Sequence, residues 1–217
     1  MDQQMLGHAW ATGRFPRAAL GLTLDDHQGC LLGNAVDAAV EFAATFRQRY
    51  IPAHTAYSDY PADRSLIGVG MTLSGPPGRG KTTLACAIAT EVLLRYKAPV
   101  YFAPAADYAT AHIMRYASNL SDAQRAEHQL LLQRAEDAAL LVIDDIGAEH
   151  ASNSRTAQDE FSRLLRWRHR EGRPTILTTN LGPNGWSDVY GPATADFLYE
   201  AAPTLIMNGT NLRRTRT

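Results

Sequence analysis

The stretch Gly75-Pro76-Pro77-Gly78-Arg79-Gly80-Lys81-Thr82 decides the fold that we predict for this chain of 217 residues. It has the spacing G-x-x-x-x-G-K-[ST] and lies between an apolar run and a helical segment. Its glycines let the backbone wrap around an anion with N–H groups pointing inward, and the N-terminus of the following helix adds partial positive charge. The stretch therefore predicts a phosphate-binding loop, in which Lys81 reaches the β- and γ-phosphates and Thr82 is a ligand of Mg²⁺.

Short apolar runs alternate with helical segments around this loop. The runs are typical of buried strands in a parallel sheet, and the segments between them are long enough for crossover helices. The predicted strands are residues 67–73, 100–103, 140–143, 175–178 and 204–207. A helix is predicted from Asn34, where apolar residues recur with a helical period. We expect a three-layer α/β domain with a five-stranded parallel sheet over residues 34–217, preceded by an extension of residues 1–33.

The third and fourth predicted strands end in residues suited to binding magnesium and water. Asp144 and Asp145 follow the third strand, and Asn180 follows the fourth. Because the carboxyl ends of parallel strands face the ligand crevice, Asp144 is expected to hold Mg²⁺ directly or through water, and Asp145 to polarise an attacking water. Asn180 is expected to orient that water. The alternatives are an acidic cap on the strand end and an asparagine that turns the chain.

The composition is that of an ordinary globular protein. Hydrophobic residues make up 45% and charged residues 20% of the chain, and the formal net charge is −1. These values argue against disorder and against a globally basic nucleic-acid binder. Cys30 and Cys86 are in no CxxC pair, and the histidines lack metal-ligand spacing, so neither a disulfide framework nor a zinc site is expected. The sequence shows no signal-peptide pattern and no membrane-length apolar run, so we expect a soluble, cytoplasmic protein.

These motifs resemble those of the AAA+ ATPases of the DnaC/DnaI replicative helicase loader group, with the IstB-like ATP-binding proteins as close relatives. The resemblance extends over about residues 15–214, and its matching stretches are residues 15–17, 22–26, 75–83, 141–149, 173–181 and 209–213. It implies the AAA+ (ASCE) form of the P-loop NTPase fold, with little or no separate lid domain. It also implies ATP and Mg²⁺ as cofactors.

The resemblance assigns roles to individual residues. The phosphate loop becomes the Walker A motif, and Thr83 adds a further contact to the nucleotide. Asp144 and Asp145 form the Walker B motif, and Asn180 is sensor 1. Arg213 aligns with an arginine near the carboxyl end that the family uses at the nucleotide. The implied catalytic residues are Lys81, Asp144, Asp145 and Asn180, with Thr82 and Asp144 as the magnesium ligands.

The resemblance also implies partners. A loader of this group binds a replicative hexameric helicase of the DnaB type, contacts single-stranded DNA and self-associates through its AAA+ interface. The DNA contact is assigned to an extra helix pair, here within residues 104–137, with Arg115, Tyr116 and Arg125 as candidates; a solvated helical face is the alternative. Residues 1–15 are either a docking peptide for the helicase or a plain chain end.

One departure from the family concerns ATP hydrolysis. The family carries arginines on the helix after sensor 1 that act on the ATP of a neighbouring subunit, but Ala193 and Phe197 occupy these positions. Because such an arginine raises the rate of hydrolysis about 10³–10⁵-fold, we expect a weak Mg²⁺-dependent ATPase unless another arginine takes its place.

Arginines gather on the helix at 157–170 and on the tail. This face is expected to bind a DNA backbone or an acidic neighbouring subunit, or else to be simply solvated. Its members are Arg163, Arg166, Arg168, Arg170, Arg173, Arg213, Arg214 and Arg216.

The expected function is the loading of a replicative helicase onto single-stranded DNA by a phage-type or reduced loader. One alternative is an IstB/TnsC-like, ATP-dependent regulator of transposition that binds duplex DNA. Another is a nucleotide-gated interaction module with little ATP turnover. A small-molecule kinase shares the phosphate loop but fits the strand-end acids less well.

Overall fold

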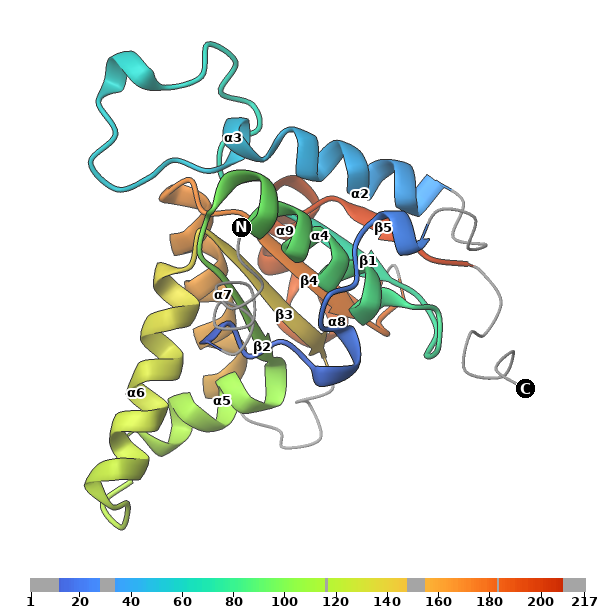
Figure 1. The fold of residues 1–217 in the computed structure, drawn as a ribbon. Helices are drawn as coiled ribbons and strands as arrows, with labels where there is room; N and C mark the ends of the chain where they lie inside the picture. Colours follow the sequence, from blue (N-terminus) through green and yellow to red (C-terminus); the bar gives the residue numbers. More distant parts are fainter. Residues whose placement is uncertain (1–11, 28–33, 116, 148–154, 183, 209–217) are drawn as a thin grey trace.

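A five-stranded parallel sheet forms the centre of the molecule (Figure 1). The computed structural model describes residues 12–27, 34–115, 117–147, 155–182 and 184–208. The strand order is β2-β3-β4-β1-β5, and all neighbouring strands are parallel. The strands are β1 Met71–Ser74, β2 Val100–Pro104, β3 Leu140–Ile146, β4 Thr175–Thr179 and β5 Thr204–Ile206. The predicted α/β fold with five parallel strands is confirmed.

Helices cover both faces of the sheet and complete three layers. The layer of α2 and α4 packs on a core that includes Leu140 and Val142, whereas α5 to α9 pack on one that includes Leu141 and Ile143. Alternate residues of β3 thus point to opposite layers, as the two-residue period of a strand requires. The helices are α2 Asn34–Ala44, α3 Phe46–Arg49, α4 Lys81–Tyr96, α5 Ala105–Met114, α6 Asp122–Asp137, α7 Arg155–Arg170, α8 Gly185–Tyr190 and α9 Pro192–Ala201, with short 3-10 helices η1 Arg17–Ala19, η2 Asp25–His27 and η3 Tyr57–Asp59. None of the helices in the described ranges combines the length and the apolar character needed to cross a bilayer.

The first strand begins later than predicted because two glycines before it lie very close to the backbone of neighbouring segments. A Cβ on Gly68 would lie 2.1 Å from the carbonyl oxygen of His169, and a Cβ on Gly70 would lie 1.9 Å from that of Thr175. The Gly70 N–H donates to the carbonyl oxygen of Ala201 at 2.7 Å instead of joining the sheet. Gly68 and Gly70 therefore lie too close to neighbouring backbone for a Cβ, and the pairing of β1 starts at Met71.

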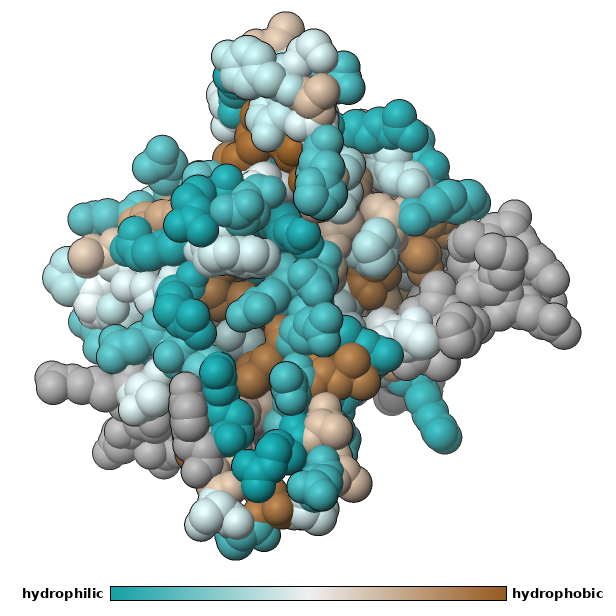
Figure 2. Space-filling view, turned by 90° about the vertical axis from the view of Figure 1, so that its left-hand side faces the viewer, coloured by the Kyte–Doolittle hydropathy of each residue, from teal (hydrophilic) through white to brown (hydrophobic). Residues whose placement is uncertain are grey.

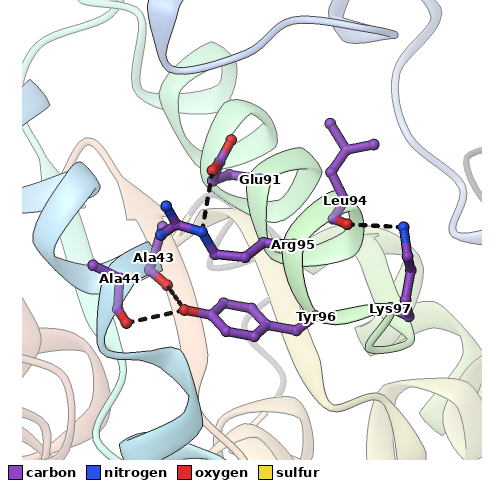
Figure 3. Close-up of polar contacts among 7 residues, drawn as sticks. All are labelled: Ala43, Ala44, Glu91, Leu94, Arg95, Tyr96 and Lys97. Atoms are coloured by element: carbon purple, nitrogen blue, oxygen red, sulfur yellow. Dashed lines mark hydrogen bonds and ion pairs between the residues drawn. The ribbon is translucent and has the colours of Figure 1, made fainter. Parts of the chain in front are cut away.

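Polar contacts hold the carboxyl end of α4 (Figure 3). The Tyr96 hydroxyl lies 2.8 Å from the carbonyl oxygen of Ala43 and 2.9 Å from that of Ala44, so it satisfies the end of α2. Lys97 follows α4 in the left-handed conformation, with φ of +56°, and its Nζ donates to the carbonyl oxygen of Leu94 at 3.1 Å. Lys97 is thus the cap of α4.

Residues 12–27, the described part of the predicted extension, pack on the domain. The Phe102 N–H donates to the carbonyl oxygen of Gly13 at 2.7 Å, and Arg134 donates to that of Thr12 at 3.0 Å. Phe15 is buried, and its ring centre lies 6.4 Å from that of Phe102. The segment therefore covers the edge of β2 and fills part of the core. Most of the predicted docking peptide lies outside the described residues.

The arginines of α7 do not form the continuous basic face that the sequence predicts. The prediction is wrong for Arg168, whose exposed fraction is 0%. Its guanidinium donates hydrogen bonds of 2.8–3.0 Å to Thr175 Oγ1 and to the carbonyl oxygens of Ala135, Glu136, Ala138 and Pro174. Arg168 therefore caps the carboxyl end of α6 and ties it to the start of β4.

Neighbouring groups engage the four other described arginines of this set. Two of them form ion pairs, Arg163 with Glu160 and Arg170 with Glu171. The other two donate hydrogen bonds to carbonyl oxygens, Arg166 to that of Ala193 and Arg173 to those of Glu136 and Asp137. Arg213, Arg214 and Arg216 lie outside the described residues. Ion pairs and helix caps therefore account for much of this charge.

Candidate nucleotide-binding site

The phosphate loop connects β1 to α4 at the carboxyl edge of the sheet. Gly75 has φ of +153°, and a Cβ there would lie 2.5 Å from the carbonyl oxygen of Met207, so this position requires glycine. Gly80 precedes α4 in the left-handed conformation, with φ of +78°, and provides no side-chain cap. No side chain of Gly80 therefore competes with an anion for the N–H groups at the start of α4.

Lys81 is the first residue of α4 and is buried, with an exposed fraction of 7%. Its Nζ donates to the carbonyl oxygens of Gly75 at 2.7 Å and Pro76 at 3.0 Å. It also donates to Oδ1 of Asn180 at 2.8 Å. The ammonium group thus joins the loop to the carboxyl end of β4. A phosphate bound in the loop would compete with these oxygens for the same N–H groups.

Thr82 and Asp144 bring a hydroxyl and a carboxylate together. Thr82 Oγ1 donates to Asp144 Oδ1 at 2.8 Å. Mg²⁺ prefers an octahedron of oxygen ligands at about 2.0–2.1 Å, in which adjacent ligands lie about 3 Å apart. The two oxygens therefore suit neighbouring positions around this ion. Because Thr82 directs its proton to Asp144, the lone pairs of its oxygen remain available, and the donor set fits Mg²⁺.

Asn180 links the loop to the second acid. Its Nδ2 donates to Asp145 Oδ1 at 2.7 Å, while its Oδ1 accepts from Lys81. The amide orientation follows, because a lysine only donates and a carboxylate only accepts. Asp145 has φ of +59°, which is uncommon for a residue with a side chain, and it is exposed. The structure therefore brings together Lys81 and Thr82 of the loop with both acids and Asn180, and leaves Asp145 open to water.

Sequence reasoning missed Thr178, which contacts both acids. Its hydroxyl donates to Asp144 Oδ1 at 2.6 Å and accepts from the Asp145 N–H at 2.9 Å. The signal that identifies it is a hydroxyl residue near the end of β4, shortly before Asn180. That signal has meaning only once β3 and β4 are known to be neighbours.

Cys86 lies in α4, and the charge of Asp144 in the site affects the pKa of its thiol. It is fully buried, and burial together with the negative charge of Asp144 raises the pKa of its thiol to about 12. The thiol is therefore neutral at physiological pH and packs as a small apolar side chain.

Arg115 and Arg125, two of the residues predicted to contact DNA, are not part of this site. They belong to the hairpin of α5 and α6, which extends away from the sheet (Figure 1). Arg115 is exposed at the carboxyl end of α5. Arg125 donates to two carbonyl oxygens of the connection between the helices, at 3.4 and 3.5 Å, and so braces the hairpin. Tyr116 and Arg213 lie outside the described residues.

The hairpin side of the molecule has a mixed surface. Figure 2 shows that hydrophilic residues cover most of this side and that hydrophobic residues form several patches among them. Exposed apolar side chains of the hairpin are Ile113 and Met114 on α5 and Leu130 on α6. Arg115 directly follows two of them. The surface therefore offers both apolar and cationic contacts.

A cluster of titratable side chains, in which His112 is buried and Arg163 is exposed, joins α5 to α7. His112 Nε2 lies 2.9 Å from Glu160 Oε2, and Arg163 lies 2.7 Å from the same oxygen. The other ring nitrogen, Nδ1, is buried with no hydrogen-bond partner among the described residues. Burial lowers the pKa of His112, with the charges of Arg115 and Arg163 acting in the same direction and Glu160 opposing them. The imidazole is therefore neutral at pH 7 and donates from Nε2 to Glu160.

The fold is the P-loop NTPase fold of the AAA+ type, and the candidate site lies where that fold has its phosphate loop. The phosphate loop follows the first strand, and the acids end a strand that lies two places from it in the sheet. The chain belongs to the family of IstB-like ATP-binding proteins, whose family model matches residues 67–201. The resemblance to the DnaC/DnaI and IstB group is thereby confirmed.

Parts of this chain are similar in sequence or in fold to known proteins. The replicative helicase loader DnaC of Escherichia coli (strain K12) is 32% identical over 123 residues, which cover 57% of this chain and 47% of that protein. An ATP-binding protein in an insertion sequence of Mycobacterium tuberculosis is 28% identical over 153 residues, covering 67% of this chain and 56% of that protein. The crystal structure of a DnaC helicase loader matches with a TM-score of 0.68 at 20% identity, covering 89% of this chain and 100% of that one. The chain spans about half the length of the curated relatives it matches.

Proposed function

We propose that this protein binds ATP with Mg²⁺ and, as a DnaC/DnaI-like loader, places a replicative hexameric helicase on single-stranded DNA. The family and the similarity to a helicase loader support the proposal. ATP binding is supported above all by two hydrogen bonds, from Lys81 to Asn180 and from Asn180 to Asp145. They connect the phosphate loop to the acid at the end of β3. Nucleotide binding then gates the helicase and DNA contacts.

The residues of the loop hold the phosphates of ATP in this proposal. Backbone N–H groups of the loop and the first turn of α4 donate to phosphate oxygens, and Lys81 neutralises part of their charge. Thr82 and Asp144 hold Mg²⁺, which when bound supplies further neutralisation of the phosphates. Asp145 is the base that orients water, and Asn180 fixes its carboxylate.

Asn180 also makes the site sensitive to its occupant. Phosphates that attract Lys81 weaken its bond to Asn180, and Asn180 stands where β4 leaves the sheet. The chain continues from there into α8 and α9, which pack on the same core as α5 and α7. ATP and ADP therefore bias the position of these helices differently, and self-association and DNA contact follow that bias.

The two lysines of the chain give a matched pair for testing the site. Lys81→Ala is expected to abolish binding of a fluorescent ATP analogue. Lys97→Ala removes the other lysine, which caps the far end of the same helix, and is expected to leave the affinity unchanged. Undiminished affinity in a folded Lys81→Ala protein would overturn the assignment of the site.

The loader function is tested with candidate replicative helicases. A pull-down of each helicase with this protein, run with ATP and with ADP, is expected to show capture that depends on the nucleotide. Single-stranded DNA is expected to change that capture, and Arg115→Ala to weaken the DNA effect. Failure to capture any replicative helicase in either nucleotide state would refute the loader proposal.

A regulator of transposition is the second candidate. The insertion-sequence protein of M. tuberculosis matches 67% of this chain, and the matching family model carries the IstB name. A regulator of this kind binds duplex DNA and forms filaments. Electron microscopy with ATP and duplex DNA separates the two candidates, because long filaments favour the regulator and a helicase complex that depends on single strands favours the loader.

The third candidate is a nucleotide-gated module that hydrolyses little ATP. It depends on whether Arg166 can replace the arginines that are absent from α9. α9 carries no arginine, yet Arg166 of α7 donates to the carbonyl oxygen of Ala193 at 2.8 Å and lies 4.4 Å from the ring centre of Phe197. Its guanidinium thus lies beside both positions where arginines are absent. If Arg166 acts on a neighbour's ATP, mixing Arg166→Ala with Lys81→Ala protein restores hydrolysis that neither has alone. No restoration favours the module without turnover.

A further inference from the structure

β3 and β4 pair irregularly at the magnesium site. Their register is regular up to Ile143 and resumes at Ile146 with a shift. Between these points, Asp144 and Asp145 of β3 lie opposite a single residue of β4, Thr178. This is a β-bulge, which bends a strand locally and redirects its side chains. The left-handed φ of +59° at Asp145 belongs to the same irregularity.

The Thr178 hydroxyl contacts both residues of the bulge. It donates to Asp144 Oδ1 at 2.6 Å and accepts from the Asp145 N–H at 2.9 Å. Thr178 has an exposed fraction of 1%, so water does not replace these bonds. Its single proton is directed to the carboxylate because the backbone N–H already acts as the donor on its other side.

Asp144 is held from two sides. Its Oδ1 accepts from Thr178 at 2.6 Å and from Thr82 at 2.8 Å. Two donors on one carboxylate oxygen set the rotation of the group and therefore the direction in which it faces a cation or its water. Without the Thr178 bond, one donor remains, and the carboxylate is free to turn about it.

We propose that Thr178 is a positioning residue, which fixes the Asp144 carboxylate for a divalent cation bound with a nucleoside triphosphate. The proposal rests on the proposed binding of Mg²⁺ and ATP at this site. Outer-shell groups of this kind typically change metal affinity about 10–100-fold. Among the described residues, no hydrogen bond joins Thr178 to the phosphate loop or to Lys81, so its removal is expected to act through Asp144.

Thr178→Val tests the proposal because valine has the same shape, suits a strand and lacks the hydroxyl. The measurement is binding of a fluorescent ATP analogue at increasing Mg²⁺, and again in EDTA. The Mg²⁺ concentration for half-maximal binding is expected to rise about 10–100-fold, while binding in EDTA stays at the wild-type level. Thr178→Ser, which keeps the hydroxyl, is expected to restore the wild-type requirement.

Thr179→Val is the matched control on the same strand. Its hydroxyl donates to the carbonyl oxygen of Ile146 at 2.7 Å and accepts from the Leu181 N–H at 3.0 Å, with no bond to either acid. It is expected to leave the Mg²⁺ requirement unchanged even if it lowers stability. Should Thr178→Val fail to fold, Thr178→Cys is compared with Thr178→Ser, since a thiol is a weaker donor of similar size.

The outcomes separate this proposal from the one on which it rests. Wild-type protein that binds the analogue without any Mg²⁺ dependence overturns the proposed magnesium site itself. Wild-type protein with Mg²⁺ dependence, together with a folded Thr178→Val protein of the same dependence, overturns the role of Thr178. An equal shift in Thr179→Val does so too, because it would show a general effect of strand hydroxyls.

Discussion

Replacement of Arg168 by methionine is expected to destabilise the protein by about 2–5 kcal/mol. Methionine retains an unbranched apolar chain, so it fills most of the space, and it removes every N–H group of the guanidinium. The Thr175 hydroxyl and the carbonyl oxygens at the end of α6 and the start of β4 then lose a buried donor. The side chain has no exposed surface through which water could take its place.

The magnitude follows from two opposing contributions. The two protons of Nη1 are shared among three carbonyl oxygens, so the five contacts amount to four hydrogen bonds, which at about 1.5–3 kcal/mol each contribute about 6–12 kcal/mol. Burial, and to a lesser extent the charge of Arg173, lowers the pKa of Arg168 to about 9. At about 1.4 kcal/mol for each pKa unit, keeping this charge inside costs on the order of 5 kcal/mol, which methionine relieves. The difference, about 1–7 kcal/mol, includes the expected loss of about 2–5 kcal/mol.

Urea denaturation followed by circular dichroism measures this loss. Arg166→Met is the control, because Arg166 is an exposed arginine of the same helix, and its replacement is expected to cost less than about 1 kcal/mol. Arg168→Lys keeps a charge with fewer donors and should fall between the two. Hydrogen exchange in the last turn of α6 should accelerate in Arg168→Met. A stability equal to that of the wild type would refute the reasoning, since the buried charge would then cost as much as its bonds contribute.

Gly70→Ala is expected to prevent soluble expression or to lower the melting temperature sharply, because its Cβ would lie 1.9 Å from the carbonyl oxygen of Thr175; Gly182→Ala, with nothing within 4 Å, should melt like the wild type. Because burial lowers the pKa of His112, the unfolded chain takes up a proton below about pH 6.5 before the folded one does. The free energy of unfolding should therefore fall as the pH drops through this range, and His112→Gln should reduce that fall; an unchanged slope would contradict the assignment. The Cys86 thiol, with its pKa raised to about 12, should resist iodoacetamide until the protein unfolds, and peptide mass spectrometry that finds rapid labelling of folded protein would contradict its burial.

Much of the candidate site could be predicted because its parts are tied to local sequence. The glycine spacing requires a loop before a helix, and this loop places Lys81 and Thr82 at the start of α4. Asp144 and Asn180 end apolar runs, and the carboxyl ends of parallel strands meet at one edge of a sheet. The prediction of their proximity needed only the order of strands and helices, and the structure confirms it.

Other features could not be read from local patterns. The face of α7 contains arginines at helical spacing, and a helical wheel does not show that Arg168 meets the end of another helix inside the protein. The late start of β1 depends on how closely Gly70 approaches β4. Both depend on the distance between packed elements, which the period of a sequence does not contain.

The sequence by itself determined the class of this protein, its phosphate loop and the acids that face it, because these follow from residue spacing and strand topology. Only the tertiary structure decided which neighbours hold those groups in place. Thr178 lies 34 residues from Asp144 along the chain and reaches it through a bulge in strand register. The physical reason is that a hydrogen bond depends on tenths of an ångström and on direction. Such geometry is set when the strands and helices pack together.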